Sequence, residues 1–443
     1  MNTNTPEEIT FDMLSDDQKN AFNVIVDAIN NKKHVMLTGG PGTGKTTLVK
    51  FIFNHFKGTG ENGIILTAPT HQAKIELSKA TLMPANTIHS VLKIRPDTYE
   101  ENVLFEQTKL PDLSTCRILT VDEGSMVDDK LFDIMIKTVP SYVSIFGIGD
   151  EDQIRPVDIS GSGTKSKFFT DPRFVQVKLT KIMRQAEGNP IIQISRNVRD
   201  GIMMSPMVDE NGNGVIKQPT IKDFLTSYFA KVKTTDDLMN NRLFAYTNAN
   251  VDNFNKIIRK YLYKTTDPVI VDEIVVLQEP YVIESMYAGK KFVDVVYNNG
   301  ELVRVNEIVH KKSAFNINHM GDCFIEYVSL KTTSVYENID ATINVIVDPV
   351  MKEKLDNYLM NVAFSFKQMK ANGKRANWEP WWQVKKKFIA IKALPACTYH
   401  KSQGSTYDDV YMYTPDALSA DFELAKQLLY VGITRARYKV NYL

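Results

Sequence analysis

The stretch "HVMLTGGPGTGKTTLVKFIFNHF" (34–56) places a glycine-rich turn between an apolar run and a helical pattern. The turn fits the pattern G-x-x-x-x-G-K-[ST], with Gly39, Gly44, Lys45 and Thr46 at its defining positions. Such glycines let backbone N–H groups close around phosphates, the lysine reaches the β- and γ-phosphates, and the hydroxyl meets Mg²⁺. Because a strand and a helix flank the turn, the sequence predicts a phosphate-binding loop rather than a plain glycine-rich turn. The other loop residues expected to bind the nucleotide are Gly42, Thr43 and Thr47.

Apolar runs of strand length continue beyond this loop. They are "GIILTA" (63–68), "RILTVD" (117–122) and "VSIFGIGD" (143–150), and a helical spacing of apolar residues precedes the loop at 14–30. Buried, continuous strands between helices are typical of an α/β fold with a doubly wound parallel sheet. Ligands bind such sheets beyond the carboxyl ends of the strands.

Two segments interrupt this alternation. Residues 91–113 predict an inserted hairpin or small subdomain, after which the α/β pattern resumes near residue 190 with a strand at 242–248. From about 271 to 392, short alternating stretches such as "FVDVVY" are typical of a small β-barrel. Within it, the polar stretch 369–378 predicts a loop.

Composition narrows the class of protein. A length of 443 residues suggests about three domains at roughly 100–200 residues each. No 18-residue apolar run and no basic start with an apolar stretch occur, so we expect a soluble, unexported protein that does not enter a membrane. Three scattered cysteines argue against disulfides or a zinc site and suit a reducing cytosol. With 53 Lys+Arg against 52 Asp+Glu, no global basic excess indicates nucleic acid, although a local groove could still bind it.

Polar residues follow two of the predicted strands. Asp122 ends one strand and is expected to hold the Mg²⁺ water shell, and Glu123 is placed to polarise an attacking water. An Asp-Glu pair is also a common helix entry, but beside a phosphate-binding loop it favours hydrolysis. Gln153, in the loop after another strand, is expected to sense the γ-phosphate and the catalytic water.

Gln18 has two interpretations. Ser15 and Gln18 have the spacing of a helix capping box, in which each side chain bonds the other residue's backbone N–H. A glutamine amide can also bond an adenine edge with two hydrogen bonds. Spacing alone favours the cap.

An ordered series of motifs resembles those of superfamily 1 DNA helicases. The motifs are "LSDDQKNAF", "GGPGTGKTT", "APTHQAK" (68–74), "TIHS" (87–90), "VDEGSM", "GDEDQIRPV", "LTKIMRQ" (179–185), "AYTN" (245–248), "YHKSQGST" (399–406) and "YVGITRAR". The RecD-like branch is the nearest, and the spread of motifs, the "NNGELVRV" block (298–305) and the length resemble the Dda helicases of T-even phages. The resemblance covers roughly residues 11–443.

The resemblance implies two RecA-like P-loop domains with parallel sheets and with ATP between them, plus a small hairpin insertion and an SH3-like β-barrel insertion. The expected segments are 1–90 and 114–189 for the first RecA-like domain, 91–113 for the pin or hairpin insertion, 190–270 and 393–443 for the second RecA-like domain, and 271–392 for the barrel insertion.

The resemblance also assigns roles at the nucleotide. Gln18 becomes the adenine reader, while still able to cap its helix. Arg184 and Arg435 match two arginine fingers of the family, which suits a planar guanidinium that neutralises charge on the γ-phosphate. A solvated helix residue is the alternative for Arg184. Arg437 has no assigned role, and a surface position or a nearby carboxylate partner is as consistent as catalysis.

Family members hold single-stranded DNA through stretches that this chain matches. The expected contacts are Thr70, His71, Thr87, His89, Phe105, Asn248, His400, Lys401 and Gln403. Hydroxyls and amides would grip phosphates, and His71 could stack on a base, although a lone histidine is more often a hydrogen-bonded loop residue. Phe105 lies where the family has its strand-separating pin; a small hydrophobic core of the hairpin is the alternative.

Two features have no clear match. Clustered tryptophans at 378, 381 and 382 are most often packing residues, with bracing or DNA contact as the alternative. The stretch "SGSGTKSK" (160–167) is a surface loop or a DNA-facing one.

The resemblance therefore implies an ATP- and Mg²⁺-dependent DNA helicase that translocates 5′ to 3′ on single-stranded DNA and unwinds duplexes in DNA replication. The alternative is a translocase ATPase that remodels protein–DNA complexes without productive unwinding; a P-loop kinase and an RNA substrate are further alternatives. Expected partners are single-stranded DNA, single-strand/double-strand junctions and a single-strand-binding or other replication protein. We expect a monomer in the cytoplasm, that of the host if the chain is phage-encoded.

Overall fold

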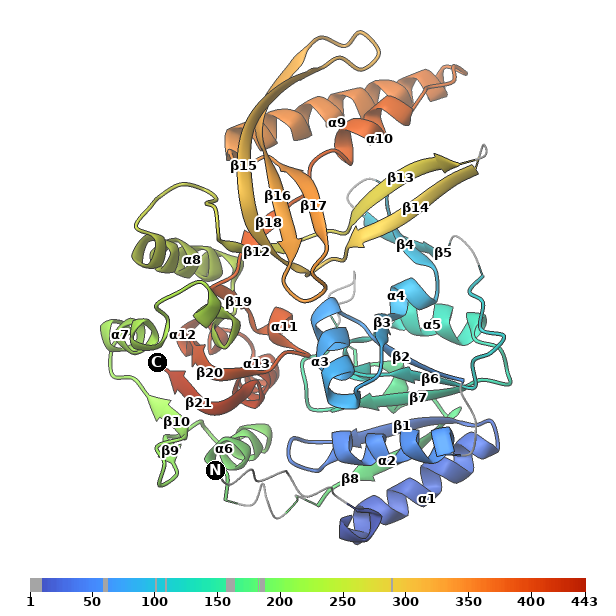
Figure 1. Cartoon of the computed structure of the whole chain (residues 1–443), viewed down its shortest axis with the longest axis vertical. Helices are drawn as coiled ribbons and strands as arrows, with labels where there is room; N and C mark the ends of the chain where they lie inside the picture. The colour runs from blue at the N-terminus through green and yellow to red at the C-terminus, as the bar shows by residue number, and fades with distance from the viewer. Residues whose placement is uncertain are drawn as a thin grey trace. The chain divides into compact units, whose positions relative to one another are not determined.

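The computed structural model describes residues 10–58, 63–99, 102–107, 110–156, 164–181, 183, 188–287 and 290–443 (Figure 1). The chain forms two compact units. Unit 1 comprises Met1–Lys231, Met239–Val251 and Cys397–Leu443, and unit 2 comprises Val232–Leu238 and Asp252–Ala396. Along the described ranges, no helix has both the length and the apolar character needed to cross a membrane.

The first sheet of unit 1 has six strands in the order β3-β2-β6-β7-β1-β8, all paired in parallel. The strands are β1 (His34–Gly39), β2 (Ile64–Ala68), β3 (Ala85–Thr87), β6 (Ile118–Val121), β7 (Ser144–Gly149) and β8 (Phe174–Leu179). The four apolar runs predicted as strands are β1, β2, β6 and β7. They occupy the middle of the sheet and are almost entirely buried, as continuous apolar strands require.

Two hydrophobic clusters pack against this sheet. One contains residues of α1 and α2, and the other contains residues of α5 together with Phe168. Helices therefore cover both faces, and the doubly wound fold predicted from the sequence is confirmed. The helices of this part are η1 (Phe11–Met13), α1 (Asp16–Asn30), α2 (Lys45–Gly58), α3 (His71–Thr81), α4 (Ile88–Val91), η2 (Gly124–Met126), α5 (Asp129–Thr138) and η3 (Lys167–Phe169).

A hairpin interrupts the first sheet where the sequence predicts an insertion. Strands β4 (Ile94–Tyr99) and β5 (Asn102–Gln107) pair antiparallel, with Phe105 opposite Pro96. The side chains of the hairpin from residue 95 to residue 109 lie outside the described part of the structure.

The second sheet of unit 1 has the order β19-β11-β20-β21-β10-β9, with β11, β20, β21 and β10 paired in parallel and β9 antiparallel at the edge. Its strands are β9 (Met207–Val208), β10 (Gly214–Lys217), β11 (Asn241–Ala245), β19 (Ala396–Thr398), β20 (Tyr407–Met412) and β21 (Ala436–Tyr442). The helices of this part are α6 (Pro190–Arg199), α7 (Ile221–Lys231), α11 (Tyr399–Ser402), α12 (Thr414–Ala417) and α13 (Phe422–Thr434). Helix α8 (Asn248–Tyr263) begins in unit 1 and continues in unit 2. A separate core joins α6 and α13 to the strands.

Unit 2 contains an antiparallel sheet in the order β17-β16-β15-β12-β18 and a separate β13-β14 hairpin. Its elements are η5 (Asp236–Met239), β12 (Ile274–Leu277), β13 (Tyr281–Tyr287), β14 (Lys290–Tyr297), β15 (Leu302–Phe315), β16 (Cys323–Ser334), β17 (Asp340–Val345), α9 (Pro349–Ala371), α10 (Glu379–Lys385) and β18 (Ile391–Ala393).

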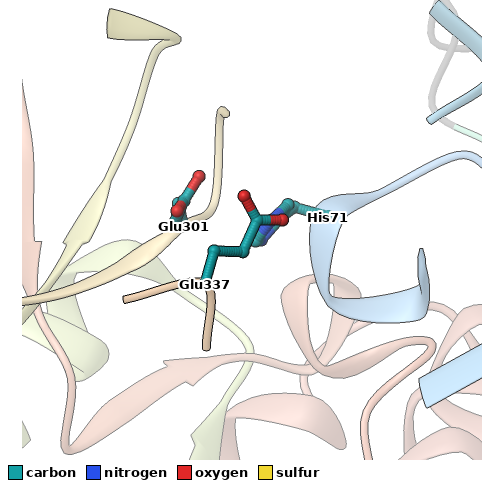
Figure 2. Close-up of side chains that lie close together, drawn as sticks. All are labelled: His71, Glu301 and Glu337. Carbon is teal, nitrogen blue, oxygen red and sulfur yellow. The ribbon is translucent and has the colours of Figure 1, made fainter. Parts of the chain in front are cut away.

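Two turns of unit 2 carry the two carboxylates drawn in Figure 2, Glu301 and Glu337. Glu301, in the turn before β15, is fully buried and accepts hydrogen bonds from Ser334 Oγ at 2.6 Å and from the Asn298 backbone N–H at 2.7 Å. Glu337 lies in the turn between β16 and β17, and its backbone N–H donates to the same Ser334 hydroxyl. Ser334 therefore ties the two turns together.

One part of unit 2 differs from the sequence prediction. The prediction for 271–392 described only short strands, but α9 is a 23-residue helix whose buried residues, Leu355, Leu359, Val362 and Phe366, have helical spacing. It packs with α10 over the far ends of β15 and β16 in a hydrophobic cluster of its own. The predicted loop 369–378 begins inside the last turn of α9 and ends where α10 starts.

Candidate nucleotide and DNA sites

The glycine-rich loop lies between the end of β1 and the start of α2, as predicted. Gly42 and Gly44 adopt φ values of 76° and 78°, which L side chains rarely adopt. The Lys45 ammonium donates to the carbonyls of Gly39 and Gly40, and the Thr43 hydroxyl donates to Gly40 O at 2.9 Å. Thr46 and Thr47 follow in the first turn of α2, where the Thr46 side chain is exposed. The loop therefore presents a cation and a hydroxyl at a helix N-terminus, a combination that suits phosphate.

Gln18 makes the capping box and also contacts this loop. Ser15 N–H donates to Gln18 Oε1 at 3.0 Å, and Gln18 N–H donates to Ser15 Oγ at 3.3 Å. The Gln18 amide nitrogen donates to Gly44 O at 3.2 Å, and the side chain is fully buried. A Cβ on Gly44 would lie 2.3 Å from that nitrogen, so the close approach requires glycine. The cap predicted from spacing is confirmed, and it places the amide against the nucleotide loop.

The acidic pair follows β6. Desolvation and the adjacent Glu123 carboxylate raise the pKa of Asp122, whereas Lys45 and Arg435 oppose that rise. Glu123 has a left-handed backbone, with φ 50° and ψ 45°, which is unfavourable for a residue with a Cβ. Strained backbone of this kind is concentrated at functional sites. The oxygens of Asp122 and Thr46 are hard ligands that fit Mg²⁺.

Arg435 approaches the acidic pair from the second sheet. It caps the C-terminus of α13, donates from Nε to Val431 O at 3.3 Å and from Nη1 to Ser405 O at 3.3 Å, and is 8% exposed. Its Nη1 lies 3.9 Å from Glu123 Oε1. The helix end and the Ser405 carbonyl hold the guanidinium where it faces the first sheet's carboxylate.

Two further contacts join residues that follow β7 of the first sheet to helices packed on the second sheet, and neither was predicted from the sequence. The Tyr430 hydroxyl, on α13, donates to Asp150 Oδ2 at 2.5 Å, both groups being buried. Gln403 donates from Nε2 to Ile154 O at 3.2 Å and to Gln153 Oε1 at 3.4 Å. Gln403, predicted as a DNA contact, thus lies against the predicted γ-phosphate sensor.

Arg184, the other predicted finger, lies outside the described residues. Its neighbour Met183 donates its backbone N–H to Gly42 O at 3.0 Å, so the chain at this point passes beside the nucleotide loop.

Three of the stretches predicted to bind DNA have the same local structure, in which a threonine caps the N-terminus of a helix. Thr70 Oγ1 accepts from Ala73 N at the start of α3, and Thr87 Oγ1 accepts from Ser90 N at the start of α4. Thr398, which the sequence analysis did not select, caps α11 in the same way. His71 is the first residue of α3 (Figure 2), and His400 and Lys401 lie within α11.

A small hollow of about 180 Å³ lies beside two of these stretches. It is lined by Pro69, Thr70, His89, Met126, Asp128, Leu131 and Ile134. Burial lowers the pKa of His89, and the nearby Asp128 carboxylate opposes this shift. A neutral imidazole in a largely apolar lining suits a nucleobase edge better than a phosphate.

In the second sheet, the His400 ring stacks on Tyr246 with centroids 6.3 Å apart, and burial lowers the pKa of His400. Asp416, also missed by the sequence analysis, accepts hydrogen bonds at Oδ2 from the backbone of Tyr246 and Thr247 and from Asn250 Nδ2. It fixes the loop that leads into Asn248, the first residue of α8.

The tryptophan cluster and Arg437 each had two interpretations from the sequence. The Trp381 ring lies in a hydrophobic cluster of unit 2 and packs edge to face with the half-buried rings of Trp378 and Trp382, which agrees with the packing alternative. Arg437 is exposed and pairs with Asp408 at 3.3 Å, the carboxylate-partner alternative. The Phe105 side chain and residues 160–163 lie outside the described part.

This geometry defines a class of protein. A phosphate-binding loop and acidic pair on one parallel sheet, faced by an arginine from a second parallel sheet, belong to P-loop motor ATPases with two RecA-like domains. An AAA domain model matches residues 22–158, a Dda helicase SH3 domain model matches 266–393, and a UvrD-like helicase C-terminal domain model matches 394–442.

Sequence similarity to known helicases identifies the family to which the chain belongs. The chain is 44% identical to the ATP-dependent DNA helicase dda of Enterobacteria phage T4, across 98% of this chain and 100% of that one. It is 23% identical to RecD of the RecBCD enzyme from Buchnera aphidicola (Schizaphis graminum), across 94% and 71%. A solved Pif1 helicase, described at forked dsDNA, shares the fold with a TM-score of 0.51 at 19% identity, across 98% and 92%. The chain belongs to the Dda helicases and is an ATP-dependent DNA helicase.

Proposed function

We propose that this helicase moves 5′ to 3′ along single-stranded DNA and separates the strands at a single-strand/double-strand junction. The observation that carries the motor mechanism is the 3.9 Å approach of Arg435 to Glu123, which gives both sheets of unit 1 a share in one nucleotide site. The 5′ to 3′ polarity is carried over from the resemblance of the sequence motifs to the RecD-like branch.

At the nucleotide, the residues have separate tasks in this proposal. Gln18 binds the adenine edge, the loop from Gly42 to Thr47 holds the phosphates, and Gln153 senses the γ-phosphate. Glu123 orients and polarises the attacking water. Arg435 and Arg184 neutralise charge on the γ-phosphate during its transfer.

Magnesium would be held by Thr46 and, through water, by Asp122. When bound, it neutralises phosphate charge and orients the β- and γ-phosphates. The protein would contribute the Asp122 carboxylate, which follows β6, and the Thr46 hydroxyl in the first turn of α2.

Transmission to DNA would use the contact between the two sheets. Gln403 bonds Gln153 and Ile154 and follows directly on the α11 stretch with His400 and Lys401. A change at the γ-phosphate can therefore reach the DNA side of the second sheet through one buried amide. Thr70, Thr87 and Asn248 would hold the backbone, while His71 and His89 contact bases.

The β4-β5 hairpin would act as the pin, with Phe105 against the last base pair. All the nucleotide-site residues assigned above come from one chain, so we propose that a monomer suffices. Kinship with a phage protein supports action in the cytoplasm of an infected cell. A single-strand-binding protein is the partner that we propose there.

Strand displacement on matched duplexes with a 5′ or a 3′ single-stranded tail tests the proposal. We expect ATP-dependent unwinding from the 5′ tail. Unwinding from the 3′ tail alone would refute the polarity, and stripping of a bound protein block without strand separation would favour the translocase alternative.

A further inference from the structure

The end of unit 2 formed by the last turn of α9, the connecting turn and α10 concentrates positive charge. This segment, residues 367–387, is called the basic tip. It has seven lysines and arginines against one acidic residue, Glu379, whereas the whole chain has a net charge of only +1. The basic residues are Lys367, Lys370, Lys374, Arg375, Lys385, Lys386 and Lys387.

The charge is segregated along α9. The part of the helix from 349 to 366 is balanced, with two lysines and two acidic residues, and its Lys352 pairs with Asp356. At the other end, Lys370, Lys374 and Arg375 are exposed, and across the described ranges no carboxylate lies within ion-pair distance of these three. A cluster of like charges repels itself unless an anion neutralises it.

The basic tip is a packed structure. The Trp381 indole N–H donates to Leu359 O at 2.8 Å, which fastens α10 to the middle of α9. Trp378 packs edge to face on Phe366 with centroids 5.0 Å apart, which closes the turn between the helices. The backbone that carries the cations is therefore held between two packed helices, and ordering on binding is confined mainly to the lysine and arginine side chains.

The aromatic rings of the tip favour one kind of nucleic acid. Single-strand grooves combine cations with exposed rings on which bases stack. In the tip, Trp381 is buried, and Trp382 is half-buried with the Lys385 and Lys386 ammoniums each 5.7 Å from its ring. The rings are thus engaged with neighbours and lysines, which leaves charge as the feature offered to a ligand. Charge without stacking suits the phosphates of a duplex, which present one negative charge per about 1.7 Å of axis.

We infer that the basic tip is a second DNA-binding surface, one that holds the phosphate backbone of duplex DNA while unit 1 holds the single strand. The inference rests on the proposed helicase function and adds a contact outside the motor sheets. A displaced single strand offers the same phosphates, so the test separates the two sources.

The test compares two triple variants of the full chain. Lys370→Gln, Lys374→Gln and Arg375→Gln remove three cations of the tip. The matched control, Lys312→Gln, Lys331→Gln and Lys352→Gln, removes three exposed cations of unit 2 that are paired with carboxylates. Unchanged melting temperatures establish that both variants fold.

Binding is measured against salt on a blunt duplex, a 5′-tailed duplex, a forked duplex and a short single strand. For the tip variant, the slope of log K against log salt should fall by about 2–3 on the blunt and tailed duplexes and stay unchanged on the single strand. The control should match the wild type. ATPase stimulated by single-stranded DNA should be equal in all three proteins.

Other outcomes overturn the inference. The proposed site is wrong if the tip variant keeps the wild-type salt slope on duplexes, or if the control variant loses as much of that slope. If the tip variant binds more weakly only to the forked duplex, the ligand of the tip is the displaced single strand and not the duplex. If the tip variant binds a polyglutamate peptide more weakly than the wild type but binds duplex DNA equally well, the tip is a site for an acidic protein. A wild-type protein without DNA-stimulated ATPase would instead refute the proposed function.

Discussion

Arg435 Nη1 lies 3.9 Å from Glu123 Oε1, so the last helix of the chain ends at the carboxylate of the first sheet. The Arg435 guanidinium is held in position because Val431 O, Ser405 O and the Thr434 hydroxyl all accept hydrogen bonds from it. This contact is the geometry that the proposed arginine finger requires, and it is the reason to test Arg435 first.

Replacing Arg435 with Ala should reduce the rate of DNA-stimulated ATP hydrolysis by about 10³–10⁵-fold, the range seen for arginine fingers. Nucleotide should still bind, because the loop from Gly39 to Thr47 is untouched. Turnover and the binding of a fluorescent nucleotide check the two halves. Arg437→Ala is the matched control, since Arg437 is exposed and pairs with Asp408. Equal losses in both variants would contradict the assignment.

Lys45→Ala should abolish ATP hydrolysis and leave single-stranded DNA binding largely intact. Lys45 donates to the Gly39 and Gly40 carbonyls of its own loop, so its loss should remove a phosphate ligand without disturbing the DNA stretches. Steady-state turnover and DNA anisotropy are the measurements. Hydrolysis at the wild-type rate would show that the site lies elsewhere.

Gln403→Ala should uncouple hydrolysis from DNA. The amide is buried and bonds Gln153 and Ile154, so its loss should lower the stimulation of ATPase by single-stranded DNA more than the basal rate. Comparison of the two rates, with DNA saturating, checks the prediction. Lys401→Ala, two residues away and exposed, should raise the DNA concentration needed for stimulation instead. If Gln403→Ala only weakened DNA binding, it would be a phosphate contact.

The middle of the first sheet could be predicted from sequence because a buried parallel strand is a continuous apolar run, as in "VSIFGIGD". In the second sheet only β11 was predicted, and the central strands β20 and β21 were not. The edge strand β8 was missed, since "FVQVKL" alternates buried and exposed positions and its apolar signal is weak. In α9, the exposed apolar residues Val350, Met360 and Phe364 blur the helical spacing of the four buried ones, so the helix was missed.

The loop and acidic pair were predictable because local spacing defines them. Tyr430 and Asp150 were not, since their contact joins residues 280 apart that no local pattern connects. Asp416 was missed for the same reason: it acts on a loop 169 residues earlier. Gln403 and Gln153 were each predicted from their motifs, but the hydrogen bond between them appears only in the structure.

Tyr430→Phe should weaken the connection between the two sheets. It leaves the buried Asp150 carboxylate without its hydroxyl donor, which costs about 1–3 kcal/mol. Urea unfolding should show a lower midpoint, and the ATPase rate should fall because Tyr430 and Arg435 share α13. The additional variant Asp150→Asn restores a neutral partner and should recover part of the stability. Wild-type stability and activity in Tyr430→Phe would mean that the bond is dispensable.

Phe105→Ala tests the pin. Phe105 lies on β5 opposite Pro96 in a hairpin that interrupts the first sheet, and a large aromatic at that position can cap the last base pair. Removing the ring should slow duplex unwinding more than movement along single-stranded DNA, since translocation needs no base pair to be opened. Strand displacement and displacement of a protein block from single-stranded DNA measure the two activities separately. Val103→Ala, on the same strand, controls for a general loss of the hairpin. An equal fall in both activities would indicate that Phe105 belongs to a small hydrophobic core, because loss of the hairpin's fold would impair every DNA contact together.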